Sequence, residues 1–489
     1  MTTEELIAAR RAEPWREALR KSKKNKERTD IPRVEMNELD AEYRSHTRLE
    51  EVNLGLTKEQ AMQEAQRCLD CPNPTCMQGC PVSINIPTFV KNIERGEFLE
   101  AARVLKETSA LPAVCGRVCP QEKQCESKCI HLKMGKPAVA IGYLERFAAD
   151  YERESGNISI PEVAEKNGIK IAVVGSGPAG LSFAGDMAKR GYDVTVFEAL
   201  HEIGGVLKYG IPEFRLPNKI VDVEIEGLRK MGVKFMTNCI VGKTISYDDL
   251  HADGFKGIFA ASGAGLPNFM NIPGENLVGV MSSNEYLTRV NLMDAANPDS
   301  DTPVLQGKKV AVIGGGNTAM DSVRTARRLG AERAMIVYRR SEEEMPARLE
   351  EVKHDKEEGV EFMTLHNPVE YLGDERGRVK QMRLQKMELG EPDASGRRRP
   401  VPVEGAIETI DVDEVIVSVG VSPNPLIPRA FQGLEVSKKG TIVVNEENMR
   451  SALPDVYAGG DIVRGGATVI LAMGDGRKAA AAMDEALRG

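Results

Sequence analysis

Short apolar runs followed at once by glycine-rich loops are the clearest pattern in the chain. Ile169–Val174 (IKIAVV) and Lys309–Ile313 (KVAVI) each precede such a loop, and each loop is followed by a helical stretch. A second apolar run then follows, Asp193–Phe197 (DVTVF) in the first case and Ala334–Tyr338 (AMIVY) in the second. Strand, loop, helix and strand in this order predict two Rossmann-like, doubly wound α/β domains in sequence.

The region before these domains has a polar, helical pattern. Lys58–Arg67 (KEQAMQEAQR) and Phe98–Lys106 (FLEAARVLK) are expected to be helices, and Thr57 with Gln60 forms a capping box at the start of the first. A linker around 155–168 separates this region from the first strand. An N-terminal α-helical domain is therefore expected ahead of the two Rossmann-like domains.

The C-terminal third predicts a return to the first Rossmann-like domain. Gly390–Pro400 (GEPDASGRRRP) is turn-rich and is expected to be a hairpin or exposed loop. Glu414–Val419 (EVIVSV) reads as a last strand before a glycine-rich region that ends in a helix, Arg477–Leu487. The predicted domains are 1–165 (helical), 166–285 (first dinucleotide-binding part), 286–412 (second dinucleotide-binding domain) and 413–489 (the rest of the first).

Composition narrows the class of protein. Of the 489 residues 41% are hydrophobic and 28% charged, which is ordinary for a globular protein of several domains. No apolar run is long enough for a membrane span, and the charged N-terminus lacks the apolar segment of a secretory signal, so a cytoplasmic protein without a membrane partner is expected. The net charge of −8 argues against nucleic acid as a partner. The basic run Arg20–Arg28 is expected to be a solvated or disordered tail, or else a docking arm for an acidic subunit.

The first glycine loop, Gly175-Ser176-Gly177-Pro178-Ala179-Gly180, has the dinucleotide-binding pattern. In such a loop the first glycine allows a tight turn, the second lets the backbone approach a pyrophosphate, and the third lets helix and strand pack closely, while the helix N-terminus offers N–H groups to the phosphates. Glu198 ends the second strand, where an acid accepts hydrogen bonds from ribose hydroxyls. An ordinary tight turn explains these features less well.

The second loop, Gly314-Gly315-Gly316-Asn317-Thr318-Ala319, is followed by a strand that ends in Arg339-Arg340 instead of an acid. Two guanidinium groups suit a 2′-phosphate, so NADPH is expected in preference to NADH. The alternative is that both arginines are merely a solvated strand end. Near the C-terminus, Gly460 and Asp461 stand where a carboxylate and a following helix can meet a flavin. Together these features predict FAD at the first loop and NADPH at the second.

Eight of the nine cysteines lie between positions 68 and 129, spaced C-x2-C-x4-C-x3-C-P and C-x3-C-x5-C-x3-C. Cytosolic thiols stay reduced, so this clustering indicates metal rather than disulfides. Cys80-Pro81 resembles the end of a bacterial ferredoxin motif, and eight thiolates could hold two 4Fe–4S clusters, although spacing alone assigns no cysteine to either. Zinc is the alternative, but only one C-x2-C pair is present. The single later cysteine, Cys239, leaves no C-x-x-C redox disulfide beside a flavin.

These residues resemble the small (beta) subunit of NADPH-dependent glutamate synthase over nearly the whole chain. The same module is similar to the large subunit of NADH-dependent ferredoxin:NADP oxidoreductase and to the N-terminal half of dihydropyrimidine dehydrogenase. The resemblance rests on Cys68–Pro81 (CLDCPNPTCMQGCP), Leu111–Gln121 (LPAVCGRVCPQ), Ile203–Leu216 (IGGVLKYGIPEFRL), Gly314–Asp321 (GGGNTAMD), Tyr338–Pro346 (YRRSEEEMP) and Ala458–Arg464 (AGGDIVR).

The resemblance implies particular ligands. One cluster would be held by Cys68, Cys71, Cys76 and Cys129, and the other by Cys80, Cys119, Cys125 and Glu145. The rival assignment uses Cys115 in place of Glu145. The resemblance also implies that Gly205 contacts FAD and that Ile211-Pro212 lies near the isoalloxazine.

The predicted activity is oxidation of NADPH at FAD, followed by transfer of single electrons through two 4Fe–4S clusters to a partner. The resemblance implies the glutamate synthase large subunit as that partner, and a ferredoxin or another flavoprotein subunit is the alternative. A non-redox zinc protein that binds other proteins is a further alternative. Hydride transfer depends on positioning, so no side chain is assigned as catalytic acid or base.

Overall fold

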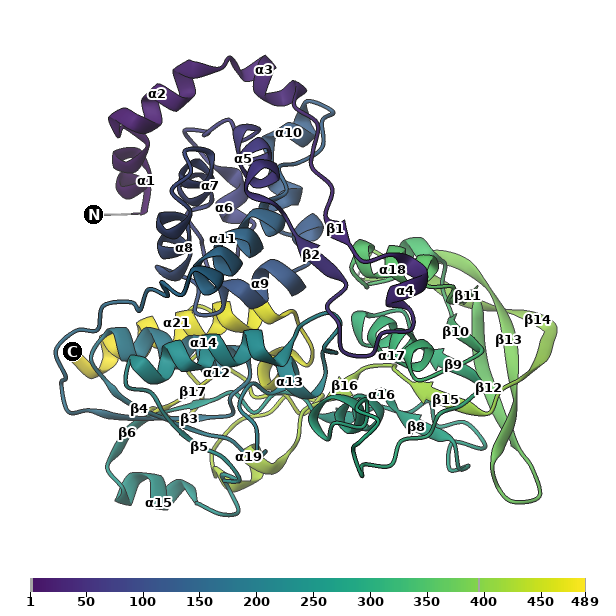
Figure 1. The fold of residues 1–489 in the computed structure, drawn as a ribbon. Coiled ribbons are helices and arrows are strands. Elements are labelled where there is room, and N and C mark those ends of the chain that lie inside the picture. The colour runs from purple at the N-terminus through teal and green to yellow at the C-terminus, as the bar shows by residue number, and fades with distance from the viewer. Residues whose placement is uncertain (1–2, 395, 489) are drawn as a thin grey trace.

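The computed structural model describes residues 3–394 and 396–488, and it places a helical N-terminal domain on top of two sheet domains (Figure 1). The capping box predicted at the start of the helix Lys58–Gln66 (α5) is present. Gln60 N donates to Thr57 Oγ1 at 3.2 Å, and Thr57 N donates to Gln60 Oε1 at 2.9 Å. None of the described helices is long and apolar enough to cross a membrane. The domain's elements are β1 (Asn37–Glu38), β2 (Asn53–Gly55), α5 (Lys58–Gln66), α6 (Thr75–Gln78), α7 (Ile86–Glu94), α8 (Phe98–Lys106), α9 (Pro112–Val118), α10 (Ile130–Lys133) and α11 (Ile141–Ser155).

The first sheet is parallel throughout and has the strand order β17-β6-β3-β4-β5. Because β17 comes from the end of the chain, this Rossmann-like domain is discontinuous, as the sequence predicts. Helices α12 and α21 lie between the sheet and the helical domain (Figure 1), so the C-terminal helix touches both. The elements are β3 (Lys170–Val174), α12 (Pro178–Lys189), β4 (Asp193–Phe197), α14 (Asn218–Lys230), β5 (Lys234–Met236), α15 (Tyr247–Ala252), β6 (Phe255–Ala260), β17 (Val456–Ala458) and α21 (Val469–Arg488).

The second sheet is also parallel, in the order β11-β10-β9-β15-β8, and a three-stranded antiparallel sheet extends from it. The hairpin expected around residues 390–400 is the turn between the two longest strands of that small sheet. The elements are β8 (Val280–Ser282), α16 (Ser283–Leu287), β9 (Lys309–Ile313), α17 (Asn317–Arg328), β10 (Arg333–Tyr338), α18 (Leu349–Glu357), β11 (Glu361–Thr364), β12 (His366–Gly373), β13 (Val379–Pro392), β14 (Arg398–Asp411) and β15 (Glu414–Val417).

Strand pairing assigns two short segments differently from the sequence analysis. Strands β8 and β15 were expected within the first Rossmann-like domain, yet β15 pairs with both β8 and β9 in the second sheet. The chain therefore enters the second sheet before residue 285 and leaves it after residue 417. Runs of two or three apolar residues fit either sheet, and only long-range hydrogen bonding distinguishes the two sheets.

The basic N-terminal run is folded, so the expectation of a disordered tail is wrong, although Lys21, Lys24 and Lys26 are exposed to solvent. It lies in α2 (Pro14–Ser22) and α3 (Asn25–Asp30), which follow α1 (Thr3–Arg11) and lie against the helical domain (Figure 1). Arg28 is only 1% exposed and pairs with Glu94 at 2.8 Å. The run folds because its arginines meet buried carboxylates that lie far away in sequence.

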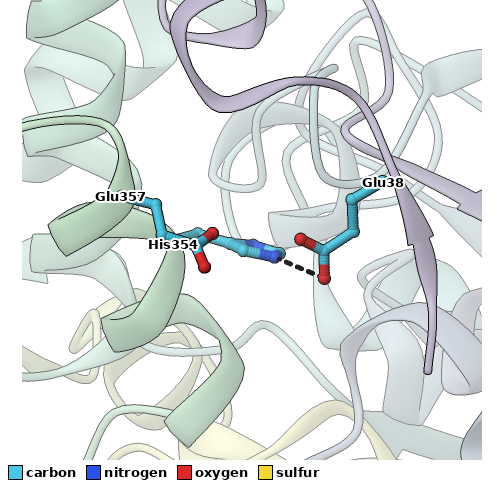
Figure 2. Close-up of side chains that lie close together, drawn as sticks. All are labelled: Glu38, His354 and Glu357. Carbon is cyan, nitrogen blue, oxygen red and sulfur yellow. Dashed lines mark ion pairs between the residues drawn. The ribbon is translucent and has the colours of Figure 1, made fainter.

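After α3 an extended strap, residues 31–56, crosses to the second Rossmann-like domain (Figure 1). In α4 (Ala41–Arg44) the buried Arg44 side chain pairs with Glu38 at 3.0 Å and with Glu358 at 3.2 Å, and it also contacts Glu357. Figure 2 shows Glu38 of the strap meeting His354 of α18, with 3.2 Å between Glu38 Oε1 and His354 Nε2.

Glu38, His354 and Glu357 place one ligand atom each within 4.8 Å of one another, which is close enough for a metal ion. The carboxylates are already neutralised, however, by Arg44 and by Lys353, whose Nζ lies 3.4 Å from Glu38. We therefore interpret the group as an interdomain ion-pair cluster that fastens the strap to α18.

Candidate functional site: a flavin cavity beside two cysteine clusters

A cavity of about 1060 Å³ lies where the two Rossmann-like domains meet the helical domain. Its wall contains most of the residues predicted to bind FAD, and we therefore call it the flavin cavity. The wall also contains part of the second glycine loop. The predicted residues in the wall are Gly175, Gly177, Glu198, Gly205, Ile211, Gly460, Asp461, Asn317 and Thr318. Gly180, Gly314, Gly316, Arg339 and Arg340 lie outside it.

The first glycine loop has the geometry that a bound pyrophosphate requires. Gly175 has a φ of +100°, and a Cβ there would lie 2.5 Å from Ala261 O. A Cβ at Gly177 would meet no atom within 4 Å, so the missing side chain leaves open space directly before α12. At Gly180 a Cβ would lie 2.1 Å from Gly175 O, because helix and loop pack closely. The three glycines therefore occupy a tight turn, an open space and a close helix–loop contact, respectively.

Glu198 is buried at the end of β4 and is held by its own loop. Its carboxylate accepts hydrogen bonds from the Ser176 amide at 2.9 Å, from the Ser176 hydroxyl, and from the Leu200 amide at 2.9 Å. The contacts of Ser176 with Glu198 were not predicted from the sequence.

Asp461, which also lines the cavity, opens the short helix α20 (Asp461–Arg464). Burial raises the pKa of its carboxyl. Behind it Asp475, only 1% exposed, accepts from the Gly460 amide at 3.0 Å and pairs with Arg464. Asp475 was not predicted from the sequence, although an acid in the largely apolar stretch ATVILAMGDGR is a detectable signal.

The second glycine loop is covered by the segment that follows Arg340. Ala347 N donates to Gly315 O at 3.2 Å, and Arg348 N donates to Asn317 Oδ1 at 2.8 Å. Gly314 has a φ of +146°, and a Cβ there would lie 2.3 Å from Ser418 O. At Gly316 the nearest atom to a Cβ, on Pro346, is 3.9 Å away, which leaves room beside the start of α17.

The two arginines after β10 differ in their surroundings. Arg340 is only 6% exposed and donates to Arg398 O and Asp393 Oδ2, both at 2.8 Å, so it holds the β13–β14 hairpin. Arg339 is exposed to solvent. Only Arg339 has a guanidinium that is not committed to a buried contact.

Four of the cysteines line a separate small cavity in the helical domain: Cys68, Cys71, Cys76 and Cys129. Burial raises the pKa of Cys68 to about 11 and that of Cys76 well above its usual value, and in Cys76 the other three thiols add to the effect. These four side chains are therefore near neighbours, and Cys129 has joined the first three from a distant part of the sequence.

A second group surrounds Glu145 of α11. Burial raises the pKa of the Glu145 carboxyl to about 8, and Glu145 Oε1 is buried without a hydrogen-bond partner. Its neighbours are Cys80, Cys119 and Cys125. The pKa of Cys80 is raised to about 12, mainly by burial and further by Glu145 and Cys119. Burial raises the pKa of Cys125 well above its usual value, and Glu145 and Cys119 also raise it.

Cys115 is also a neighbour of this second group. Its pKa is raised well above the usual value by the Cys119 thiol and by burial, and further by Glu145 and Cys80. Its own thiol points to Met473 of α21, with 3.5 Å between the two sulfurs. Cys239 lines the flavin cavity instead and is far from both groups in the sequence.

The spacing of the sulfurs suits clusters better than single zinc ions. A tetrahedral zinc site with bonds of about 2.3 Å brings its sulfurs to within about 4 Å of one another. Among the residues that the structure describes, no three cysteine sulfurs lie within 4.8 Å of one another. Wider spacing is what a cubane needs, because each thiolate binds a different iron.

The flavin cavity and the second cysteine group share a wall. Val118 and Pro120, the two neighbours of Cys119, both line the cavity. Helix α21 closes the junction, because a Cβ at its Gly474 would lie 3.0 Å from Pro81 O, directly after Cys80. A redox group in the cavity would therefore lie beside the second cysteine group.

Comparison with known proteins agrees with this division of the chain. A family model described as dihydropyrimidine dehydrogenase domain II, 4Fe-4S cluster, matches residues 44–157, and one described as pyridine nucleotide-disulphide oxidoreductase matches residues 169–486. FprA of Mycobacterium tuberculosis in complex with NADPH has the same fold over 66% of this chain and 85% of its own, with a TM-score of 0.55 and 20% sequence identity.

Two relatives are much closer in sequence. The small chain of NADPH glutamate synthase from Escherichia coli K12 is 37% identical over 86% of this chain and 90% of its own length. The beta subunit of NADP(+)-dependent formate dehydrogenase from Moorella thermoacetica is 38% identical over 84% of this chain and 60% of its own length.

Fold and site together define a pyridine-nucleotide oxidoreductase with an N-terminal 4Fe–4S domain. Within that class the chain belongs to the family of the glutamate synthase small chain. The resemblance read from the sequence is thereby confirmed.

Proposed function

We propose that this chain oxidises NADPH at FAD and passes the electrons singly, through two 4Fe–4S clusters, to a partner protein. The shared wall carries the proposal: both neighbours of Cys119 line the flavin cavity, so flavin and second cluster would lie side by side. A flavin accepts a two-electron hydride and releases single electrons, which is the conversion that NADPH and a cluster require. The free thiols of all nine cysteines fit a reducing, cytoplasmic compartment.

For the cofactors, the loop glycines and helix α12 would hold the FAD pyrophosphate, and Glu198 would face its ribose. Gly205, Gly460 and Asp461, which line the same cavity, would contact the remainder of the flavin. Gly314, Gly316, Asn317 and Thr318 would hold the NADPH pyrophosphate, with Arg339 as the principal contact to the 2′-phosphate and Arg340 in support. These groups bind and orient, and none needs to transfer a proton.

For the clusters, the first would take Cys68, Cys71, Cys76 and Cys129, and the second Cys80, Cys119, Cys125 and Glu145. The unpartnered, buried Glu145 Oε1 supports the carboxylate as eighth ligand, since a buried carboxylate without a partner carries a large desolvation cost. The contact of Cys115 with Met473 supports a packing role for that thiol.

Two substitutions separate the rival ligands. In Cys115→Ala we expect both clusters to assemble, with about eight irons per chain by chemical analysis, as two cubanes require. In Glu145→Ala we expect the second cluster to be lost or to change its electron paramagnetic resonance spectrum. The opposite pattern, loss in Cys115→Ala and an unchanged second cluster in Glu145→Ala, would assign Cys115 as the ligand.

The overall function is tested by reducing the purified holoprotein with NADPH without oxygen. We expect flavin absorption and the broad iron–sulfur absorption to bleach together. A protein that holds zinc and no iron would contradict the proposal.

The partner that we propose is the glutamate synthase large subunit, because the E. coli relative, which this chain covers almost completely, is named as its small chain. The formate dehydrogenase relative, similar in identity, favours a second candidate, another electron-transfer complex such as a ferredoxin:NADP oxidoreductase. Affinity purification from the native cell distinguishes them. Co-purification with a large subunit that makes glutamate from 2-oxoglutarate and glutamine supports the first, and recovery of another redox subunit supports the second.

A further inference from the structure

The loop that carries Cys68 and Cys71 is gripped by the N-terminal helices. Asp70, between the two cysteines, is fully buried and has a φ of 51°, which is unusual for a residue other than glycine. Arg16 of α2 donates to both carboxylate oxygens of Asp70, with a shortest distance of 2.6 Å. Arg20 of the same helix donates to Asp70 Oδ2 at 2.7 Å. Two guanidinium groups thus meet one carboxylate directly beside two expected cluster ligands.

Further cations surround the same loop. Arg11 of α1 donates to the Asp70 carbonyl at 2.9 Å, and Lys91 donates to the Cys68 carbonyl at 2.6 Å while lying completely buried. The only other carboxylate in these contacts is Glu94, which pairs with Lys91 and also with Arg28. Positive charge is therefore in excess around the first cysteine group.

The second cysteine group has the opposite surroundings. Glu145 stands among its thiols, and Glu126 follows Cys125 directly, buried with a single cationic partner, Arg33, at 2.8 Å. The charged side chains that act most strongly on Cys125 are these two carboxylates.

We propose that helices α1 and α2 are a cationic cover for the first cluster, and that Arg11, Arg16 and Arg20 hold its reduction potential above that of the second. The proposal rests on the proposed function, because it needs both clusters. Reduction adds one negative charge to a cluster, and nearby cations favour the reduced form while carboxylates disfavour it. Electrons would then collect at the first cluster, away from the flavin cavity, and leave from there to a partner that is the oxidant. The cover precedes residue 44, where the matched iron–sulfur family model begins.

The test compares two substitutions of opposite charge in the full-length holoprotein. Arg20→Gln removes a positive charge but leaves Arg16 on Asp70, so the first cluster should become harder to reduce. Asp70→Asn removes a negative charge and leaves the arginines unopposed, so the same cluster should become easier to reduce. Redox titration followed by electron paramagnetic resonance measures both potentials, and iron analysis reports whether the clusters are present.

A control is available on the same helices. Arg10 of α1 pairs with Glu107 at 2.6 Å and, among the described residues, forms no ion pair with the cysteine loop, so Arg10→Gln should leave both potentials unchanged. If the Asp70→Asn variant fails to assemble its first cluster, Arg11→Gln is used in its place. Arg11→Gln must then lower the reduction potential of the first cluster, as Arg20→Gln does.

The outcomes separate this inference from the proposed function. The inference fails if Arg20→Gln and Asp70→Asn shift the potential of the first cluster in the same direction. It also fails if Arg20→Gln has its full iron content and leaves that potential unchanged. In either case the helices would only fasten the loop. Absence of iron or of NADPH-reducible flavin in the unmodified protein would instead overturn the proposed function.

Discussion

The two glycine loops have the same strand–loop–helix design but differ in what surrounds them. The first loop faces the large cavity, and the acid at the end of its second strand, Glu198, is bonded back to Ser176 of the loop itself. The second loop is covered by the segment after Arg340, and its strand ends in one exposed and one engaged arginine. We propose that the glycines of both loops leave room for phosphates and that the strand ends distinguish the two nucleotides.

The largest expected effect is at the first loop. Gly177→Val places a branched side chain in the open space before α12, and because φ there is −68° the backbone accepts valine without strain. We expect FAD affinity to fall at least about 100-fold, which corresponds to about 3 kcal/mol. Flavin content of the purified protein measures it. Gly227→Ala in α14, where a Cβ also meets nothing within 4 Å, is the control and should keep its flavin. Full flavin content in Gly177→Val would mean that the pyrophosphate lies elsewhere.

The second largest effect is expected at Arg339, which follows β10 where Glu198 follows β4. In Arg339→Ala the loss of a charged hydrogen bond to the 2′-phosphate, worth about 1.5–3 kcal/mol, should raise KM for NADPH about 10–100-fold. KM for NADH, which lacks that phosphate, should change little. Arg333→Ala, at the start of the same strand and paired with Glu361, is the control. An equal rise in KM for NADPH and for NADH would contradict the assignment of Arg339 to the 2′-phosphate.

The smallest effect is expected at Arg340. Its guanidinium holds the hairpin, so Arg340→Gln should lower stability by about 1 kcal/mol and change KM for NADPH less than Arg339→Ala does. Thermal unfolding together with steady-state kinetics measures both quantities. A loss of NADPH affinity as large as that of Arg339→Ala would show that Arg340 leaves the hairpin when the nucleotide binds.

The features that the sequence predicted well are local ones. Strands β4 and β9 and helix α8 have the expected bounds, because an apolar run or a helical period is complete within a few residues. The sheet to which β8 and β15 belong could not be read in the same way, since their runs are too short to distinguish two similar sheets.

Contacts between residues that are far apart in the sequence explain the features that could not be predicted. Arg20 and Arg28 were expected in a basic tail because their acidic partners, Asp70 and Glu94, lie many residues away. Glu145 has the same character: only the resemblance pointed to it, and its isolation among buried thiols becomes visible in three dimensions.

The strap also has a mechanical consequence. The strap begins at the helices that hold Asp70, its middle is fastened to α18 by Glu38 and Arg44, and it then returns to the helical domain through β2 (Figure 1). A turn of the nucleotide domain against the flavin domain would therefore pull on a tether whose far end is the loop of Cys68 and Cys71. Truncation at residue 44, where the family match starts, would cut that tether and uncover the loop in one step.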